Sequence, residues 1–100
     1  MRGDVFVATA GTKTRPVVEI STPELSRPLI AHLTTTHRQV PTQIPVSDIS
    51  AAGVNRECWV NLYAIETIDR YRLGPPIGRL DPETLHSLCA AIKAATGCDY

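Results

Sequence analysis

A helical pattern occupies only the C-terminal end of this chain, and short strand-like segments fill most of the rest. Between Asp81 and Gly97, apolar residues recur with the 3.6-residue period of one helix face, at Leu85, Leu88, Cys89 and Ile92. Asp81 is a good N-cap, the next residue is a proline, and Gly97 stands where a C-cap glycine belongs. The sequence therefore predicts one C-terminal amphipathic helix.

The segments before that helix have the composition of β-strands. Valine, isoleucine, threonine and aromatic residues are frequent in them, and glycines, prolines and polar residues separate them. The predicted strands are residues 4–8, 16–20, 29–34, 42–46, 57–65 and 77–80. Residues 11–14 are expected to form a loop, residues 21–25 a helical turn and residues 69–73 a turn. We therefore expect a mainly β (α+β) fold over residues 1–100, a single-domain small barrel with the helix packed on it.

Composition excludes several classes of protein. Ten basic and ten acidic residues give zero net charge, whereas a duplex-DNA binder is usually strongly basic. No apolar run approaches 18 residues, so no membrane-spanning helix is expected. Residues 1–6 do not resemble a signal peptide, which indicates a cytoplasmic protein. Three cysteines without a Cys-x-x-Cys spacing predict free thiols, and neither they nor the histidines have the spacing of zinc ligands.

Two segments carry polar groups that suit a phosphate. Arg15 enters the second predicted strand, and the third strand ends in Thr34–Thr36. Arginine keeps its proton and offers five fixed donors, and threonine hydroxyls can donate to the same group. This combination indicates chemistry on a phosphodiester that needs no metal. The alternative is structural: Arg15 bridges to Asp4 or Glu19, and the threonines are simply strand formers.

Several motifs, taken in their order along the chain, resemble one family. They are Arg2-Gly3-Asp4-Val5, Thr14-Arg15-Pro16-Val17-Val18, Ala31-His32-Leu33-Thr34, Pro41-Thr42-Gln43-Ile44-Pro45-Val46, Thr67-Ile68-Asp69-Arg70-Tyr71-Arg72-Leu73 and Ile77-Gly78-Arg79-Leu80. This set resembles the MazF/PemK toxins of type II toxin–antitoxin systems over nearly the whole chain. The resemblance implies an SH3-like barrel of the CcdB/MazF type, a homodimer without a cofactor, and metal-independent, sequence-specific cleavage of single-stranded RNA. It also implies a cognate MazE-like antitoxin as partner.

The resemblance also implies roles for individual residues. The family's catalytic arginine falls on Arg15 and its catalytic threonine on Thr34. Cleavage in this family proceeds by attack of the neighbouring 2′-hydroxyl on phosphorus. Beside these two positions, the residues themselves offer further candidate RNA contacts, namely Lys13, Thr14, Thr35, Thr36, His37 and Arg38. The alternative for Lys13, His37 and Arg38 is that they are solvated loop residues. A function of another class stays open, namely a catalytically inactive CcdB-like barrel that acts by binding a protein target or an antitoxin.

Neither implied catalytic residue is a good base, so a proton acceptor has to come from elsewhere. Strand alternation places Arg15, Val17 and Glu19 on one face of their strand. If Val17 pairs opposite Thr34 in an antiparallel hairpin, Glu19 lies opposite His32. The hypothesis is that Glu19 orients His32 and that the imidazole moves protons. The alternative is a structural Glu–His contact that only holds the hairpin.

Trp59 and Tyr63 are the aromatic residues of the predicted fifth strand. We expect them in the core or at a dimer contact. The alternative is that they serve as platforms on which the bases of a single strand stack.

Overall fold

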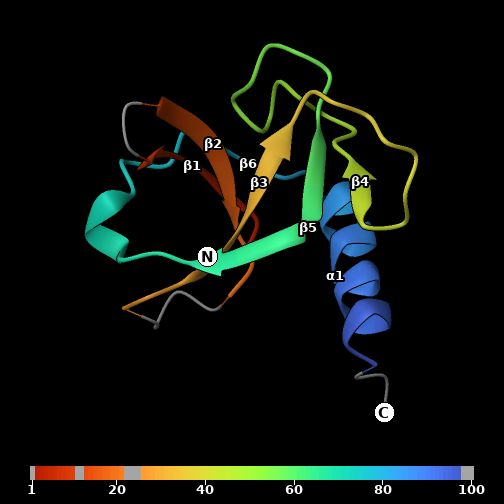
Figure 1. The fold of residues 1–100 in the computed structure, drawn as a ribbon. Coiled ribbons are helices and arrows are strands. Elements are labelled where there is room, and N and C mark those ends of the chain that lie inside the picture. The colour runs from red at the N-terminus through yellow and green to blue at the C-terminus, as the bar shows by residue number, and fades with distance from the viewer. Residues whose placement is uncertain (1, 11–12, 22–25, 98–100) are drawn as a thin grey trace.

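A computed structural model describes residues 2–10, 13–21 and 26–97. Within these ranges, six strands form one antiparallel sheet, strongly curved into a half-barrel, in the order β4-β5-β3-β2-β1-β6 (Figure 1). The elements are β1 (Asp4–Ala10), β2 (Lys13–Glu19), β3 (Leu29–Thr34), β4 (Gln43–Pro45), β5 (Trp59–Thr67), η1 (Arg70–Arg72), β6 (Gly78–Arg79) and α1 (Pro82–Thr96). The expected mainly β domain with one C-terminal helix is confirmed.

The predicted strands are present, and most of the differences lie at their ends. β3 has the predicted bounds, whereas β2 begins three residues earlier than expected and includes Lys13 and Thr14, which were predicted to lie in a loop. β2 includes them because β1 and β2 pair in register up to Ala10 and Lys13. The predicted turn at residues 69–73 contains the short 3-10 helix η1. Most of the helical turn predicted at residues 21–25 lies outside the described residues.

The helix α1 has the predicted caps and the predicted buried face. The carboxylate of Asp81 accepts hydrogen bonds from the backbone N–H of Thr84 at 3.0 Å and from its hydroxyl at 2.6 Å. Gly97 ends the helix in the left-handed conformation, at φ 69°. Leu88 is fully buried and packs into the larger core cluster, which also includes Val5, Val18 and Val60. Asp81 also accepts from the N–H of Asp48 at 3.1 Å, which ties the start of α1 to the loop after β4.

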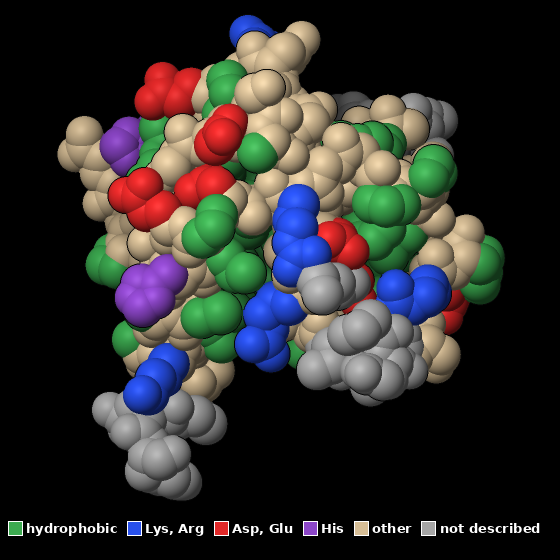
Figure 2. All heavy atoms as spheres, turned by 180° about the vertical axis from the view of Figure 1, so that it is seen from behind, with side chains coloured by type: hydrophobic (Ala, Val, Ile, Leu, Met, Phe, Trp, Pro, Cys, Tyr) green, Lys and Arg blue, Asp and Glu red, His purple; other side chains and the backbone are tan. Residues whose placement is uncertain are grey.

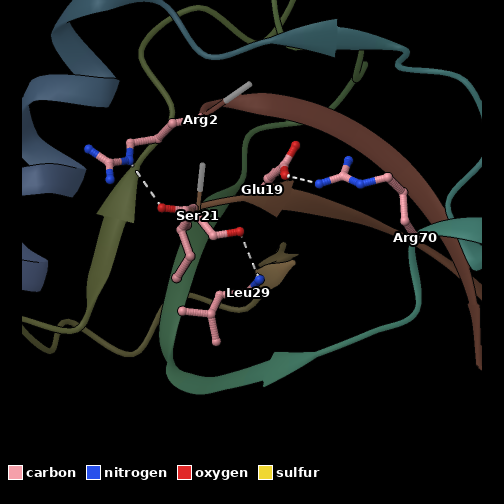
Figure 3. Close-up of polar contacts among 6 residues, drawn as sticks. Arg2, Glu19, Ser21, Leu29 and Arg70 are labelled. Atoms are coloured by element: carbon pink, nitrogen blue, oxygen red, sulfur yellow. Dashed lines mark hydrogen bonds and ion pairs between the residues drawn. The ribbon is translucent and has the colours of Figure 1, made fainter. Parts of the chain in front are cut away.

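A second, smaller cluster lies on the opposite face of β1, β2 and β3. It consists of Phe6, Ala8, Val17 and Ile30, and residues of the η1 segment pack against it. An ion pair closes this contact: Arg70 of η1 donates to the fully buried carboxylate of Glu19 at 2.8 Å (Figure 3). Ile68 and Leu73, on either side of η1, therefore cover part of this face of the sheet.

Neither α1 nor η1, the helices within the described part of the chain, has the length and apolar character needed to cross a bilayer.

Candidate functional site

The register between β2 and β3 decides which predicted site residues meet. Val17 pairs with His32 and Glu19 with Ile30. The predicted register, with Val17 opposite Thr34 and Glu19 opposite His32, is therefore wrong by two residues. The observed register still places Arg15, Glu19, His32 and Thr34 on one face of the sheet, because paired residues point to the same side. When it is continued by two residues, Arg15 comes opposite Thr34.

Pro16 explains why β2 and β3 separate just before this point. Proline has no N–H to donate to a neighbouring strand. The described pairing of β2 with β3 covers only residues 17–19 of β2, whereas residues 13–18 of β2 pair with β1. β2 and β3 therefore diverge beyond the pair Val17–His32, and we call this point the fork. Arg15 lies on its β2 arm and Thr34 on its β3 arm.

A cavity of about 450 Å³ lies at the β3 end of this fork, and Arg15 is not among the residues that line it. Pro16, Leu33 and Thr34 line it on the side of the sheet, and residues 53–56, including the exposed Arg56, line it from the loop before β5. Cys58 also lines it, and burial raises the pKa of its thiol, which keeps the sulfur protonated and unreactive near neutral pH. Arg56 is a cation near the predicted site that the sequence analysis did not identify, since it lies in a long loop with no motif around it.

Arg15 has the exposure expected of a group that binds a ligand. Its side chain is exposed on β2, where the backbone pairs with Ala8. The acidic residues that could have neutralised it have other partners: Asp4 lies 3.6 Å from Arg79, and Glu19 binds Arg70. Within the described part of the chain, the Arg15 guanidinium makes no hydrogen bond or ion pair. The structural alternative for Arg15 is therefore not supported.

Thr34 ends β3 with its hydroxyl already oriented. Its Oγ1 accepts a hydrogen bond from the N–H of Thr36 at 3.1 Å, in a local turn. A hydroxyl has one hydrogen to donate in addition to its lone pairs. The bond from Thr36 therefore leaves the hydrogen of Thr34 for another acceptor, such as a phosphate oxygen at the fork.

The predicted Glu19–His32 pair does not form. Glu19 is fully buried against Arg70 (Figure 3), and the Nε2 atom of His32 lies 3.2 Å from the carboxylate of Glu66 on β5. The reason is the two-residue difference in register, which moves Glu19 away from His32. His32 keeps an acidic partner, but that partner is Glu66.

The other predicted RNA contacts lie around the same end of the sheet. Thr14 is exposed on β2, and the exposed residues Thr35, Thr36, His37 and Arg38 follow β3. Lys13 belongs to β2, and its side chain is outside the described part of the structure.

The side-chain amide of Gln43 fixes the loop after β3. Its Nε2 donates to the carbonyl of Thr36 at 3.0 Å, and its Oε1 accepts from the N–H of Arg38 at 2.8 Å. These bonds hold the backbone on both sides of His37.

Trp59 has a partner that the sequence did not reveal. The ring of His37 stacks on its indole, with centroids 4.4 Å apart and planes 2° from parallel. Trp59 pairs directly with Thr34 across β3 and β5, so this stack lies beside the fork. No sequence pattern could have found it, because it depends on how the loop after β3 folds back.

Charges are unevenly spread over the face of the molecule that Figure 2 shows. On the face in Figure 2, one group of acidic side chains lies at the upper left, and the basic side chains lie mostly apart from it. Among the described residues, no cluster of three or more His, Cys, Asp or Glu side chains is placed to hold a metal ion.

Comparisons with known proteins agree on one family. The family model described as a PemK-like, MazF-like toxin of type II toxin-antitoxin systems matches residues 1–96. A Mycobacterium tuberculosis protein named probable endoribonuclease MazF5 is 31% identical over 102 residues, which cover 97% of this chain and 93% of that protein. Another, named probable endoribonuclease MazF2, is 28% identical over 101 residues, which cover 97% and 98% of the two chains.

Solved structures have the same fold. A mycobacterial endoribonuclease in complex with its cognate antitoxin superposes with a TM-score of 0.85 at 25% identity, covering 100% of this chain and 97% of that one. Mycobacterium tuberculosis toxin MazF-mt6 superposes with a TM-score of 0.82 at 30% identity, covering 97% and 99%. Fold and sequence therefore agree, and the chain belongs to the PemK-like, MazF-like toxins of type II toxin–antitoxin systems.

Proposed function

We propose that this chain is a sequence-specific endoribonuclease that cleaves single-stranded RNA without a metal ion, with Arg15 and Thr34 binding the scissile phosphate. The observation that carries the proposal is the exposed Arg15 guanidinium, which has no partner among the described residues and lies on the same face of the sheet as Thr34. The relatives named endoribonucleases support this function over a CcdB-like barrel that only binds a protein.

The proposed reaction is an internal transesterification. The 2′-oxygen attacks the neighbouring phosphorus, the bond to the 5′-oxygen breaks, and the products carry a 2′,3′-cyclic phosphate and a 5′-hydroxyl. The 2′-hydroxyl gives up a proton, and the departing 5′-oxygen takes one. Between these steps the phosphorane carries extra negative charge on its non-bridging oxygens, which is where fixed donors accelerate the reaction most.

Arg15 and Thr34 match that charge distribution. A guanidinium can donate two parallel hydrogen bonds to phosphate oxygens and stays charged throughout. The Thr34 hydroxyl, whose oxygen accepts from Thr36, keeps its hydrogen to donate to a further phosphate oxygen. Loss of one such donor typically costs about 3–4 kcal/mol of barrier. Two donors from the two arms of the fork would therefore supply a large part of the catalysis.

Proton transfer needs a further group, for which His32 is the candidate. It lies two residues before Thr34, on the same face of β3, and its imidazole contacts Glu66 at 3.2 Å. A carboxylate partner holds an imidazole in one orientation, as general acid–base catalysis requires. We propose that His32, oriented by Glu66 and not by Glu19, moves a proton during cleavage.

The proposed partners follow from the relatives. A mycobacterial endoribonuclease of this fold was solved with its cognate antitoxin, so we propose that an antitoxin also neutralises this chain. We further propose that the toxin acts as a homodimer in the cytoplasm. Size-exclusion chromatography with light scattering tests the dimer, and a monomer mass at working concentration would contradict it.

The deciding experiment is incubation of the purified protein with RNA in excess EDTA, followed by analysis of the new ends. We expect wild type to leave 2′,3′-cyclic phosphate and 5′-hydroxyl ends, and Arg15→Ala to leave the RNA intact. Lys93→Ala, which removes an exposed cation of α1, is the matched control and should cleave normally. Intact RNA with wild type, or cleavage by Arg15→Ala at the wild-type rate, would contradict the proposal.

A further inference from the structure

The stack of His37 on Trp59 leaves one aromatic face open beside the fork. Trp59 is half-buried and lies against the sheet, whereas the His37 side chain is exposed. The two ring planes are 2° from parallel, so a planar group stacked on the outer face of the imidazole would also lie parallel to the indole. The pair therefore presents to solvent the flat face of the His37 imidazole, which the Trp59 indole supports from behind.

This surface is held in place rather than loosely attached. Gln43 is 8% exposed, and its amide bonds to the backbone of both Thr36 and Arg38, the two neighbours of His37 in the chain. A ring that is already ordered loses little conformational freedom when a second ring stacks on it. The arrangement therefore suits recognition of a planar group.

The position of the surface matches the substrate. Trp59 pairs with Thr34, so the two residues are directly opposite on neighbouring strands, about 5 Å apart at their Cα atoms. A group stacked on His37 thus lies next to a phosphate that Thr34 contacts. The exposed Arg38 follows His37 in the chain and offers a cation for the next phosphate of the backbone.

We propose that a nucleobase adjacent to the scissile phosphate stacks on the exposed face of His37, with Trp59 backing the imidazole. This inference rests on the proposed function and adds a specificity-determining residue to it. Stacking accepts any base, because every base has a π-face, but purines offer more area than pyrimidines. Stacking on His37 therefore favours RNA that carries a base at this position, and a purine over a pyrimidine.

The test measures binding separately from cleavage. The probe is a short RNA with a 2′-deoxy residue at the cleavage position, which cannot be cut, and a matched series in which one base at a time is abasic. Trp59 is the single tryptophan of the chain, so its fluorescence reports on the stack directly. We compare wild type with His37→Ala, His37→Phe and Arg38→Ala, after thermal melts show that each variant is folded.

We expect His37→Ala to bind the intact oligonucleotide about tenfold more weakly, within the range that one stacked base contributes. His37→Phe, which keeps a flat ring, should bind close to wild type. The loss in His37→Ala should vanish for the one oligonucleotide that lacks the stacked base. Arg38→Ala should instead weaken binding to every oligonucleotide in the series, because a phosphate contact does not depend on the base.

Three results would overturn the inference. One is equal affinity of His37→Ala and wild type for the intact oligonucleotide, and another is a loss that is the same for every abasic position. The third is a change in the oligomeric mass of His37→Ala with no position-specific loss of RNA affinity. That result would assign the stack to a contact between copies of the chain. If wild type cleaves RNA and one of these results appears, only the inference fails. If wild type neither binds nor cleaves RNA, the proposed function fails with it.

Discussion

At the scale of single residues, the proposed catalysis depends on the shape of the Arg15 side chain as well as on its charge. Arg15→Lys keeps a positive charge but replaces the planar fork with a single ammonium point charge. We therefore predict that the lysine variant loses about 10²–10³ in single-turnover cleavage rate, as expected for loss of a positioned donor. Rapid-quench kinetics with saturating enzyme measures this. A rate within a few-fold of wild type would mean that charge alone is needed.

His32 gives a second prediction at this scale. Histidine is the side chain that ordinarily changes charge between pH 5 and pH 8, and acid–base catalysis contributes about 10²–10⁴ in rate. We predict that the cleavage rate of wild type varies with pH across this range and that His32→Gln flattens the profile. Glu66→Gln, which removes the carboxylate partner that orients the ring, should slow cleavage less than His32→Gln does. A wild-type profile that is already flat and unchanged by His32→Gln would remove His32 from the mechanism.

At the scale of elements, the N-cap of α1 links the helix to the sheet and predicts a pH effect on stability. Burial alone would raise the pKa of Asp81, but hydrogen bonds from the Thr84 hydroxyl and from the backbone of Thr84 and Asp48 outweigh it and hold the pKa below its ordinary value. Asp81→Ala removes this cap and should lower the free energy of unfolding by about 1–2 kcal/mol at pH 7. Urea denaturation measures this loss.

The sign of the pH effect follows from the lowered pKa. The folded state binds its proton less readily than the unfolded state, so the charged carboxylate stabilises the fold above about pH 4, the ordinary aspartate value. That stabilisation is lost as the pH falls through the pKa of the folded state. The stability difference between wild type and Asp81→Asn should therefore be larger at pH 7 than at pH 2.5. A difference that does not change with pH would contradict the lowered pKa.

Features of the helix and strands that depend on residues nearby in the chain could be predicted from the sequence, whereas features that depend on distant residues could not. The caps Asp81 and Gly97 act within one helical turn, so the bounds of α1 followed from the sequence. Pro16 accounts for where the β2–β3 pairing ends, but the register of that pairing is set by long-range packing, and strand alternation alone could not supply it. Alternation nevertheless placed Arg15 and Thr34 correctly on one face, because the error was an even number of residues.

The predicted and missed site contacts divide in the same way. Glu19 binds Arg70, which is 51 positions away in the chain, and no local pattern indicates so distant a partner. The stack of His37 on Trp59 likewise requires that the loop after β3 folds back, which Gln43 fixes from another strand. Motif resemblance predicted catalytic roles for Arg15 and Thr34, whereas the surroundings of these residues became visible only in the folded chain.

At the scale of the whole molecule, zero net charge limits how the protein can bind RNA. Long-range attraction is weak, so affinity has to come from a few cations at the site and from stacking. Each phosphate neutralised on a single strand contributes about −0.7 to the slope of log K against log salt concentration. With Arg15, Arg38 and Arg56 near the fork, we predict a slope of about −2 for a non-cleavable RNA.

Titrations at several salt concentrations check this prediction. Arg38→Ala should make the slope shallower by about 0.7, whereas His37→Ala should leave it unchanged because a stacking contact releases no counterions. A slope several-fold steeper would show that cations outside this site hold the RNA, and would move the binding surface elsewhere.

The most direct test of the central claim is a double-mutant cycle on the cleavage step itself. Single-turnover rates would be measured for wild type, Arg15→Ala, Thr34→Val and the double variant, with Thr34→Ser as a control that keeps the hydroxyl. Residues that act as a unit on one transition state are strongly non-additive. We predict that each single substitution slows cleavage severely and that the second then adds little. Single substitutions whose losses multiply in full in the double variant, or a Thr34→Val variant with the wild-type rate, would contradict the claim that the two side chains act on the same phosphate.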